Sequence, residues 1–301
     1  MRQLYEMLVQ KLSGSVLWKE PMQKHTTFRI GGPADIMILP NSIEELHEIL
    51  GIIRDADVSY MVVGAGSNLL VSDKGIRGVV IKIGPAFADI CIEGNKLIAG
   101  AGATLTAASR RAQAASLSGL EFAVGIPGSV GGAIMMNAGA YGGEICQVLE
   151  SAEGMDSLGN IINYTNQEMH FGYRHSRLME EELIALSGTF LLKPDDPELI
   201  LSRMQDITER RREKQPIDMP CAGSVFKRPP DNYVGPLVEK AGLKGYRIGG
   251  AEVSTKHAGF IVNVGGATCK DVLDLIGFVQ STIKDKYNVI LEPEIRVVGE
   301  V

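Results

Sequence analysis

The chain has 301 residues, of which 45% are hydrophobic and 22% charged, and a formal net charge of −6. That length predicts about two domains, and that composition is typical of a soluble globular protein, which excludes the disordered and fibrous classes. The negative charge argues against broad nucleic-acid binding, which needs a basic face, and no apolar run reaches the roughly 20 residues that span a bilayer.

The N-terminus and the cysteines indicate a cytoplasmic protein. Residues Met1 to Leu12 place Leu4 and Leu8 on one helical face, unlike the continuous apolar core of a signal peptide. The cysteines are far apart and form no C-x-x-C pair, which argues against a metal finger or a redox dithiol. Reduced thiols are therefore expected at Cys91, Cys146, Cys221 and Cys269.

The N-terminal part of the chain alternates helix and strand patterns. Ser42 to Glu45 has the pattern of a capping box, which predicts a helix running to about Asp55. The other predicted elements here are a helix over Met1 to Leu12 and strands over Ala34 to Leu39, Val58 to Val63 and Val79 to Ile83. This order is an α/β start.

A first glycine-rich loop, Val62 to Val71, follows one of these strands. Gly64 and Gly66 match the first two glycines of the dinucleotide-binding pattern G-x-G-x-x-G, and glycine lets backbone N–H groups close around a phosphate. The sixth position is Leu69 and not glycine, so the Rossmann pattern fails. A turn between two buried strands is the ordinary interpretation, and a phosphate cradle is the sharper one.

The middle of the chain favours an α+β fold over a doubly wound parallel sheet, because hairpins and helices are mixed. The predicted elements are a hairpin over Ile90 to Ala99 turning at Gly94-Asn95, an alanine-rich helix from Thr104 to about Leu117, a second glycine-rich stretch from Gly125 to Gly143, a hairpin over Glu150 to Tyr164 turning at Leu158 to Asn160, and an apolar strand over Leu183 to Leu192.

The remainder begins after a breaker, Lys193 to Pro197, and we place a domain boundary near it. The elements predicted beyond the breaker are a helix over Glu198 to Lys214, a Gly/Pro-rich segment over Pro216 to Gly250, a strand near Phe260 to Val264, a helix from about Cys269 to Tyr287 and a strand near Ile295 to Val298.

Ser224 lies in a short loop between prolines, with Lys227 and Arg228 beside it. A stiff backbone can aim the hydroxyl, and the cations can bind an anionic substrate. A nucleophile elbow needs glycine two positions before and after the serine, whereas Ala222 and Phe226 stand there. Ser224 is therefore a candidate proton donor rather than a nucleophile, and turn chemistry with solvated cations is the ordinary interpretation.

Two further segments carry charged side chains that fit an active site. Phe171 to Ser176 holds Arg174, whose guanidinium can bind a carboxylate bidentately, although a surface cluster is the ordinary interpretation. Leu291 to Arg296 places Glu292 and Glu294 around a proline before a strand. A surface ion pair is the ordinary interpretation there, and a carboxylate at the mouth of a site is the sharper one.

Short motifs along nearly the whole chain resemble the family of UDP-N-acetylenolpyruvoylglucosamine reductases, also called UDP-N-acetylmuramate dehydrogenases, of bacterial peptidoglycan synthesis. Each motif is weak by itself, but their number and order are specific. The motifs are His25 to Gly32, Val63 to Leu70, Gly125 to Ala133, Asn137 to Gly142, Tyr173 to Ser176, Ala222 to Lys227, Gly242 to Gly250 and Leu291 to Arg296.

The resemblance implies FAD and an α+β fold of the vanillyl-alcohol-oxidase (PCMH) type. An FAD-binding domain of two α/β subdomains is expected over residues 1–200, with its core over about 25–195, and an α+β substrate-binding domain over 201–301. Backbone amides of both glycine loops, with the Ser67 and Asn68 side chains, are expected to hold the cofactor. The matching positions are Gly64, Ala65, Gly66, Ser67, Asn68, Leu69, Gly125, Ile126, Gly128, Ser129, Gly132 and Gly139.

The implied reaction is the reduction by NADPH, through FAD, of the enolpyruvyl group of a UDP-sugar. Hydride reaches C3, and charge builds at C2 as an enolate. Arg174 matches the family arginine that neutralises the substrate carboxylate and the enolate, and Ser224 matches the serine that protonates C2. Glu294 matches a second active-site acid, expected to hydrogen-bond in its neutral form because an ionised carboxylate would repel the enolate.

The resemblance also implies substrate contacts, among which Lys214 is expected to reach the diphosphate and Arg228 stands where another branch has asparagine. The positions are Tyr141, Tyr173, Lys214, Arg228 and Arg296. The segment between Arg174 and Lys214 lacks the insertion of the longer branch, so the chain resembles the short (type II) form.

The partners implied are the UDP-sugar and NADPH, with no nucleic acid, no metal, no membrane insertion and no obligatory protein partner. Two alternatives remain open at this point. One is another FAD-dependent oxidoreductase of the same fold that acts on a small alcohol or sugar. The other is a non-catalytic protein that binds a UDP-sugar or a nucleotide.

Overall fold

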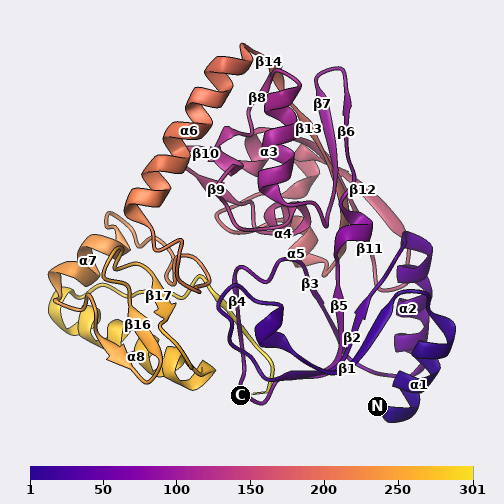
Figure 1. Cartoon of the computed structure of the whole chain (residues 1–301), viewed down its shortest axis with the longest axis horizontal. Helices are drawn as coiled ribbons and strands as arrows, with labels where there is room; N and C mark the ends of the chain where they lie inside the picture. The colour runs from indigo at the N-terminus through magenta and orange to yellow at the C-terminus, as the bar shows by residue number, and fades with distance from the viewer. Residues whose placement is uncertain (301) are drawn as a thin grey trace. The chain divides into compact units, whose positions relative to one another are not determined.

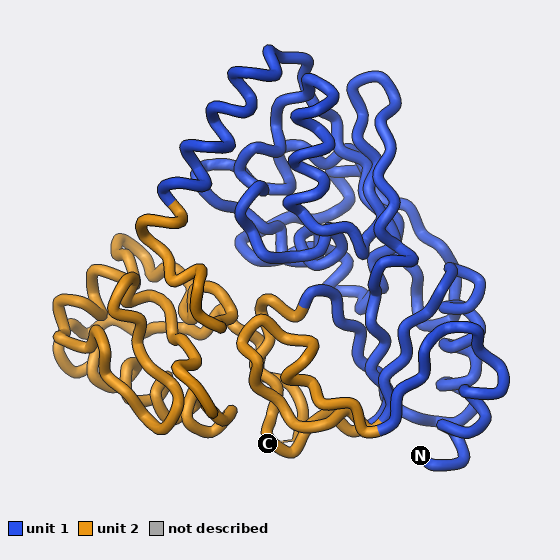
Figure 2. The backbone as a smooth tube through the Cα atoms, in the orientation of Figure 1, with its two compact units in different colours: residues 1–18, 36–65, 78–210 blue, residues 19–35, 66–77, 211–301 orange. Residues whose placement is uncertain are grey.

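The computed structural model describes residues 1–300 of the chain. They form two compact units, each assembled from separate stretches of sequence (Figure 2). Unit 1 comprises Met1–Trp18, Ile36–Ala65 and Gly78–Arg210, and unit 2 comprises Lys19–Asp35, Gly66–Arg77 and the chain from Arg211 onward. The sequence predicts an FAD-binding domain over residues 1–200 and a substrate-binding domain over residues 201–301. These domains are defined by their ligands, so the division at residue 200 stays a prediction.

Unit 1 contains a five-stranded antiparallel sheet with the order β12-β11-β13-β7-β6 (Figure 1). Both predicted hairpins are confirmed, because Glu93 pairs with Lys96 and Met155 pairs with Ile161. The strands are β6 (Ile90–Glu93), β7 (Lys96–Gly100), β11 (Leu149–Met155), β12 (Ile161–Thr165) and β13 (Ile184–Leu191). Hairpins in one sheet, with helices packed on it, make the fold α+β as predicted.

The alanine-rich helix begins where the sequence predicts it. The Thr104 hydroxyl accepts the N–H of Ala107 at 3.1 Å and caps α3 (Leu105–Ala114). The helix ends earlier than predicted because Leu117 and Ser118 form a short strand, β8 (Leu117–Ser118), against β14 (Lys193–Pro194).

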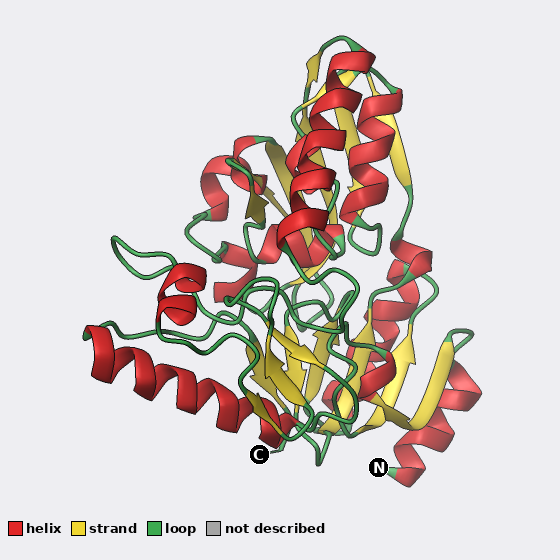
Figure 3. Ribbon diagram, turned by 60° about the vertical axis from the view of Figure 1, so that its left-hand side comes forward, coloured by secondary structure: helices red, strands yellow, loops and turns green. Residues whose placement is uncertain are grey.

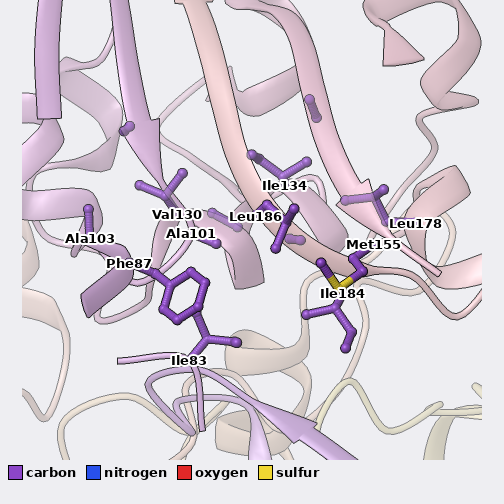
Figure 4. Close-up of a cluster of buried hydrophobic side chains, with 14 of the residues drawn as sticks. Ile83, Phe87, Ala101, Ala103, Val130, Ile134, Met155, Leu178, Ile184 and Leu186 are labelled. Atoms are coloured by element: carbon purple, nitrogen blue, oxygen red, sulfur yellow. The ribbon is translucent and has the colours of Figure 1, made fainter. Parts of the chain in front are cut away.

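Two short helices of unit 1 share one apolar cluster. They are α4 (Val130–Met135) and α5 (Arg177–Glu180). Val130 and Ile134 from α4 and Leu178 from α5 are fully buried and lie in the same group of apolar side chains (Figure 4). Both helices are therefore anchored in the core of unit 1.

A second sheet has the order β1-β2-β5-β3, and β3 and β5 run parallel with Tyr60 opposite Val79. Its strands are β1 (Ser15–Pro21), β2 (Pro33–Leu39), β3 (Tyr60–Val63) and β5 (Ile76–Lys82), with helices α1 (Arg2–Lys11) and α2 (Ile43–Asp55). The chain passes from one unit to the other within β1, β2 and β5. The apolar pattern that predicted these strands is a burial pattern, since Val79, Val80 and Ile81 are all 0% exposed.

The predicted capping box at the start of α2 is only half formed. The Ser42 hydroxyl accepts the N–H of Glu45 at 3.2 Å, as expected. The Glu45 carboxylate does not return to Ser42, because it accepts N–H groups of Ser13 (2.6 Å), Gly14 (2.8 Å) and Asn41 (2.6 Å). The reciprocal half of that prediction is therefore wrong, and Glu45 instead holds the segment that leads into β1.

Unit 2 combines an antiparallel sheet, in the order β15-β16-β17, with a long helix and a parallel pair of strands. Its elements are β4 (Leu69–Val71), α7 (Val234–Lys240), β15 (Arg247–Ile248), β16 (Ala251–Val253), β17 (Ile261–Asn263), α8 (Cys269–Tyr287) and β18 (Arg296–Val298). Helices and strands are mixed in both units (Figure 3). Residues Phe28, Ile30 and Leu70, far away in sequence, are buried with α8 in the core of unit 2.

The remaining elements are one long helix, a two-residue strand pair and several short turns. Helix α6 (Pro197–Lys214) begins in unit 1 and ends in unit 2, and β9 (Gly139–Ala140) pairs with β10 (Gly143–Glu144). Single 3-10 turns occur at Met22–Lys24, Pro85–Phe87, Glu121–Ala123, Ile145–Gln147 and Asn166–Met169. Over residues 1–300, no helix has the length and apolar character that crossing a membrane requires.

Candidate active site

The first glycine loop needs glycine at Gly66 because the chain passes close to another backbone. Gly66 has φ +66, and a Cβ atom there would clash with the carbonyl oxygen of His25 and lie 3.0 Å from the Cα of Thr26. The N–H of Thr27 donates to the carbonyl of Gly66 at 3.2 Å and fixes this approach. The sequence motif from His25 to Gly32 therefore packs against the first glycine loop and holds its backbone.

The N–H groups of this loop fit an anionic group. Among the described residues, the backbone N–H groups of Gly66, Ser67 and Asn68 donate to no protein acceptor, although Gly66 is buried. Buried N–H groups are normally paired, so the unpaired N–H of Gly66, followed by two more on the half-buried Ser67 and Asn68, fits a ligand such as a pyrophosphate. The residues present thus fit the cofactor that the sequence predicts.

The two glycine-rich segments meet in unit 1. A Cβ atom on Gly64 would clash with the hydroxyl of Ser129, which caps α4 by accepting the N–H of Gly132 at 3.3 Å. Other glycines in the second segment serve the protein itself. A Cβ on Gly131 would lie 2.7 Å from the Cβ of Ala101, so this glycine lets α4 pack closely on its neighbours.

The second segment also contains hydrogen-bonded loops at the remaining predicted cofactor positions. The N–H of Gly128 donates to the carbonyl of Ile126 at 2.9 Å, and the carbonyl of Gly128 accepts the N–H of Leu105 at 2.9 Å. Gly139 begins β9, where a Cβ would lie 2.8 Å from the carbonyl oxygen of Gly143. Gly125 precedes Ile126 in the same loop of unit 1.

Arg174 occupies a tight two-residue turn in unit 1. Gly172 and His175 exchange both backbone hydrogen bonds, at 3.2 and 3.3 Å, and leave Tyr173 and Arg174 at the tip. Arg174 has φ +56, a left-handed conformation that is rare for an arginine, and its guanidinium lies 4.9 Å from the centroid of the Tyr173 ring. Such strain is often retained where a side chain must be aimed.

Tyr141 sits in a comparable position on the β9–β10 hairpin. With Gly142 it forms the two-residue turn, at φ +54 and +87, and its side chain is 40% exposed. Positive φ at both turn positions is the geometry of a type I′ turn, which normally favours asparagine or glycine. The turn therefore exposes the Tyr141 side chain to solvent although the left-handed backbone conformation is unfavourable for tyrosine.

Unit 2 brings Ser224 and Glu294 together. The N–H of Glu294 donates to the carbonyl of Val225 at 2.7 Å, and the N–H of Lys227 donates to the carbonyl of Glu292 at 2.8 Å. The segments carrying the two predicted residues thus run side by side as an antiparallel pair. Gly223, at φ +79, makes the bend that precedes Ser224.

Glu294 is also tied to the first glycine loop. The Asn68 side-chain amide donates to the carbonyl of Glu294 at 3.2 Å, and the N–H of Arg296 donates to the carbonyl of Asn68 at 2.9 Å. Strand β18 then pairs with β4, with Arg296 opposite Leu69. Within unit 2, the candidate acid therefore lies directly beside the candidate cofactor loop.

The cations beside Ser224 are directed elsewhere. The Lys227 ammonium lies 3.3 Å from the Glu292 carboxylate, and the Arg228 guanidinium lies 4.0 Å from the centroid of the Tyr233 ring. The Ser224 hydroxyl donates to the carbonyl of Phe226 at 3.1 Å. Neither of these two cation contacts involves Ser224. That Lys227 and Arg228 bind an anionic substrate stays a prediction.

Two thiols near the candidate residues stay protonated. Burial raises the pKa of Cys221, and burial, with the Glu144 carboxylate nearby, raises the pKa of Cys146. A protonated thiol is a poor nucleophile. Beside Arg174, hydrogen bonds from His175 and His170 lower the pKa of Glu180, so this carboxylate is ionised at neutral pH.

The predicted residues divide between the units. Unit 1 holds Arg174, Tyr141, Tyr173 and the second glycine segment, whereas unit 2 holds Ser224, Glu294, Lys214, Arg228 and Arg296. Two residues that sequence reasoning did not assign have structural ties to these positions. They are Thr27, whose hydroxyl donates to the carbonyl of Cys221 at 2.6 Å, and Asn137, which contacts the Arg174 turn.

Both residues had a signal in the sequence, since Thr27 lies in the motif from His25 to Gly32 and Asn137 opens the motif from Asn137 to Gly142. Thr27 donates to a residue almost two hundred positions away, which no local pattern indicates. Within residues 1–300, no group of His, Cys, Asp and Glu side chains is arranged to hold a metal ion.

Comparisons with known proteins decide the family. The model of the UDP-N-acetylenolpyruvoylglucosamine reductase C-terminal domain matches residues 215–298, and that of an FAD binding domain matches residues 34–165. A curated relative from Caldanaerobacter subterraneus subsp. tengcongensis, named UDP-N-acetylenolpyruvoylglucosamine reductase, is 50% identical and covers 98% of this chain and 99% of its own. The chain belongs to the UDP-N-acetylenolpyruvoylglucosamine reductase family.

Other members of this reductase family agree with that assignment. A relative of the same name from Syntrophomonas wolfei is 51% identical over 93% of this chain and 94% of its own. The crystal structure of the UDP-N-acetylenolpyruvylglucosamine reductase from Thermus caldophilus is 36% identical, with a TM-score of 0.82 over 95% of this chain and 99% of that one.

These findings confirm the family and the flavoprotein fold that the motifs predict. The reductase-family member is an FAD-dependent oxidoreductase, so the alternative of a non-catalytic binding protein is set aside. The roles of the individual residues stay predictions.

Proposed function

We propose that this enzyme reduces UDP-N-acetylglucosamine enolpyruvate to UDP-N-acetylmuramate, with NADPH as reductant and FAD as cofactor, in peptidoglycan precursor synthesis. The observation that supports this most is local to unit 2. There the Ser224 and Glu294 segments pair directly beside the loop whose N–H groups fit a pyrophosphate. A curated relative named UDP-N-acetylenolpyruvoylglucosamine reductase has 50% sequence identity to this chain.

The chemistry to be catalysed is reduction of a carbon–carbon double bond. When bound, FAD supplies to C3 of the enolpyruvyl group the hydride that it has taken from NADPH. Negative charge then builds at C2 and spreads into the substrate carboxylate as an enolate. The main task of the protein is to stabilise that charge and to deliver a proton to C2.

Arg174, Ser224 and Glu294 divide this task. Arg174 binds the substrate carboxylate bidentately and offsets the enolate charge. Ser224 protonates C2, and because its hydroxyl donates to the Phe226 carbonyl at 3.1 Å, this hydrogen bond must break before the proton is delivered. Glu294, protonated, donates a hydrogen bond to the carboxylate region.

The remaining predicted residues contact the UDP-sugar. Lys214, at the end of α6, binds the diphosphate, and Arg228 and Arg296 add positive charge in unit 2. Tyr141 and Tyr173 contribute aromatic contacts from their exposed turns in unit 1. We place the enzyme in the cytoplasm, without an obligatory protein partner, because its substrates are soluble nucleotides.

Flavin spectroscopy tests this function. The purified protein should show flavin absorbance that NADPH bleaches under anaerobic conditions. The enolpyruvyl UDP-sugar should restore the absorbance rapidly and air only slowly. Rapid restoration by air, with no response to the UDP-sugar, would favour the alternative of an oxidase of the same fold acting on a small alcohol or sugar.

Replacing Ser224 separates its role from that of the cofactor. Ser224→Ala should lower turnover by about 10²- to 10⁴-fold, the usual contribution of a positioned acid, while NADPH still bleaches the flavin at the wild-type rate. Ser281→Ala is the control, because the Ser281 hydroxyl also donates to a backbone carbonyl, that of Phe278 at 3.0 Å, on the exposed side of α8. An equal loss in both half-reactions would refute the assigned role.

A further inference from the structure

Asn137 joins the second glycine segment to the turn that carries Arg174. Asn137 is 2% exposed and lies two residues after the end of α4. The amide nitrogen donates to the carbonyl of Gly172 at 3.1 Å and to the Glu144 carboxylate at 2.8 Å, and the amide oxygen accepts the N–H of Cys146 at 3.0 Å. Only this orientation of the amide satisfies all three partners.

The Arg174 turn requires support from outside. Gly172 and His175 close it, and Arg174 holds a left-handed φ of +56, which is uncommon for a residue with a side chain. Ser176, the residue after His175, donates through its hydroxyl to the carbonyl of Met135 at 2.8 Å. The turn is thus attached to the end of α4 on both sides, through Asn137 and through Ser176.

Both ends of this connection are rigid. Ile134 of α4 and Leu178 of α5 are fully buried in one cluster of unit 1 (Figure 4). The Asn137 amide connects the chain just after α4 with Gly172, which lies five residues before α5. Small shifts of the turn are therefore resisted at Gly172, two residues before Arg174.

Asn137 has no spare donor for a ligand. Both of its amide hydrogens are donated to protein acceptors, and the side chain is almost entirely buried. Any effect on the reaction must therefore pass through the groups that it holds. Of these, the Gly172 carbonyl belongs to the turn that aims the arginine.

We propose that Asn137 is a positioning residue that sets the direction of the Arg174 guanidinium through the carbonyl of Gly172. The proposal rests on the proposed function, in which Arg174 binds the carboxylate of the substrate. It concerns the half-reaction that consumes the UDP-sugar, and it leaves the half-reaction with NADPH unaffected.

The variant Asn137→Gly tests this role by removing the side-chain amide. Asn137 has φ +40, a conformation that glycine adopts freely, so the substitution removes the amide without straining the backbone. With the FAD-loaded protein, kcat for the UDP-sugar should fall by about 10- to 100-fold, because a misplacement of about 1 Å has effects of that size. The rate of flavin bleaching by NADPH should stay within about two-fold.

Asn166→Ala is the matched control. The Asn166 amide also bridges two carbonyls of unit 1, those of Cys146 at 2.8 Å and Leu149 at 2.7 Å, but it makes no bond to the Arg174 turn. A merely structural brace should lower stability in both variants and leave kcat unchanged in both. The proposal requires that only Asn137→Gly lowers kcat.

A double substitution tests the route through the arginine. In an Arg174→Lys background, which has already lost the bidentate contact, Asn137→Gly should reduce kcat by less than about three-fold. Multiplying effects of the two substitutions, or an equal fall in both half-reactions, would overturn the proposal. A wild-type flavin that the UDP-sugar cannot re-oxidise would instead overturn the proposed function, so the two failures are distinguishable.

Discussion

At the scale of single residues, the polar side chains of the site are used mainly to hold backbone. Asn68 was predicted to contact the cofactor, yet its amide donates to the carbonyl of Glu294, and Thr27 holds the carbonyl of Cys221. Hydrogen bonds to these carbonyls fix the backbone at Cys221 and Glu294 and leave the side chain of Glu294 out of the bond. The cost of losing one such bond is that of a buried acceptor without a donor, about 1 to 3 kcal/mol.

The cysteines provide a prediction at this scale. Burial, with the Asp73 carboxylate nearby, raises the pKa of Cys269 to about 11, so about one thiol in a thousand is ionised at pH 8. Cys91 is exposed. Iodoacetamide at pH 8 should alkylate Cys91 and leave Cys269 unmodified in the native protein, as read by peptide mass spectrometry. In urea, both should react; rapid native labelling of Cys269 would contradict its burial.

At the scale of elements, long periodic segments were predictable and short ones were not. The pattern from Cys269 to Tyr287 gave helix α8 because its apolar spacing is the burial pattern itself. The pairing of strand β4 was not predicted, because its partner, β18, lies at the other end of the chain. Helix α4 was missed because it begins Val-Gly-Gly, where close packing on Ala101 outweighs the poor helix propensity of glycine.

Helix α8 depends on a residue from the first part of the chain. The Asp73 carboxylate accepts the N–H groups of Cys269 at 2.8 Å and Lys270 at 3.1 Å, at the helix N-terminus. Asp73→Ala should lower the free energy of unfolding by about 1 to 2 kcal/mol, the range for a lost cap, in urea titrations. Asp274→Ala, which breaks only the exposed pair with Lys270, should cost less than about 0.5 kcal/mol. Equal effects would count against the capping role.

Glu45 gives unit 1 a dependence on pH. Burial would raise the pKa of its carboxyl, but N–H bonds from Asn41, Gly14 and Ser13 prevail and lower the pKa below 4.5. A lowered pKa means that the stabilisation is complete above the unfolded value and is lost as the pH falls through the folded one.

Glu45→Gln should therefore cost about 1 to 3 kcal/mol of unfolding free energy at pH 7. The difference from wild type should shrink as the pH falls below about 4.5, where the wild-type carboxyl becomes protonated. Urea titrations across this pH range measure both effects. Glu48→Gln, on the exposed face of α2, is the control and should change little at either pH. A constant difference at all pH values would show that charge is not the cause.

At the scale of the whole molecule, the motifs predicted the family, which the comparisons confirm, but not how the chain divides into units. The site residues stay predictions. The predicted boundary near residue 200 follows the breaker from Lys193 to Pro197, whereas unit 2 also includes Lys19–Asp35 and Gly66–Arg77. The amino-acid composition of these two segments does not indicate that they belong to unit 2. Their membership is decided by pairing and burial over long distances in sequence, as with Phe28 and Leu70, which are 0% exposed.

The C-terminal segment alone should therefore fail to fold. A fragment of residues 201–301 lacks β4, the Asp73 cap, and the buried side chains of Phe28, Ile30 and Leu70. Deleting several large core side chains costs about 2 to 5 kcal/mol each, which approaches the whole stability of a small domain. In urea, the fragment should show no cooperative transition by circular dichroism, whereas the full chain should. A fragment that unfolds cooperatively, with dispersed amide NMR signals, would instead establish residues 201–301 as an autonomous domain.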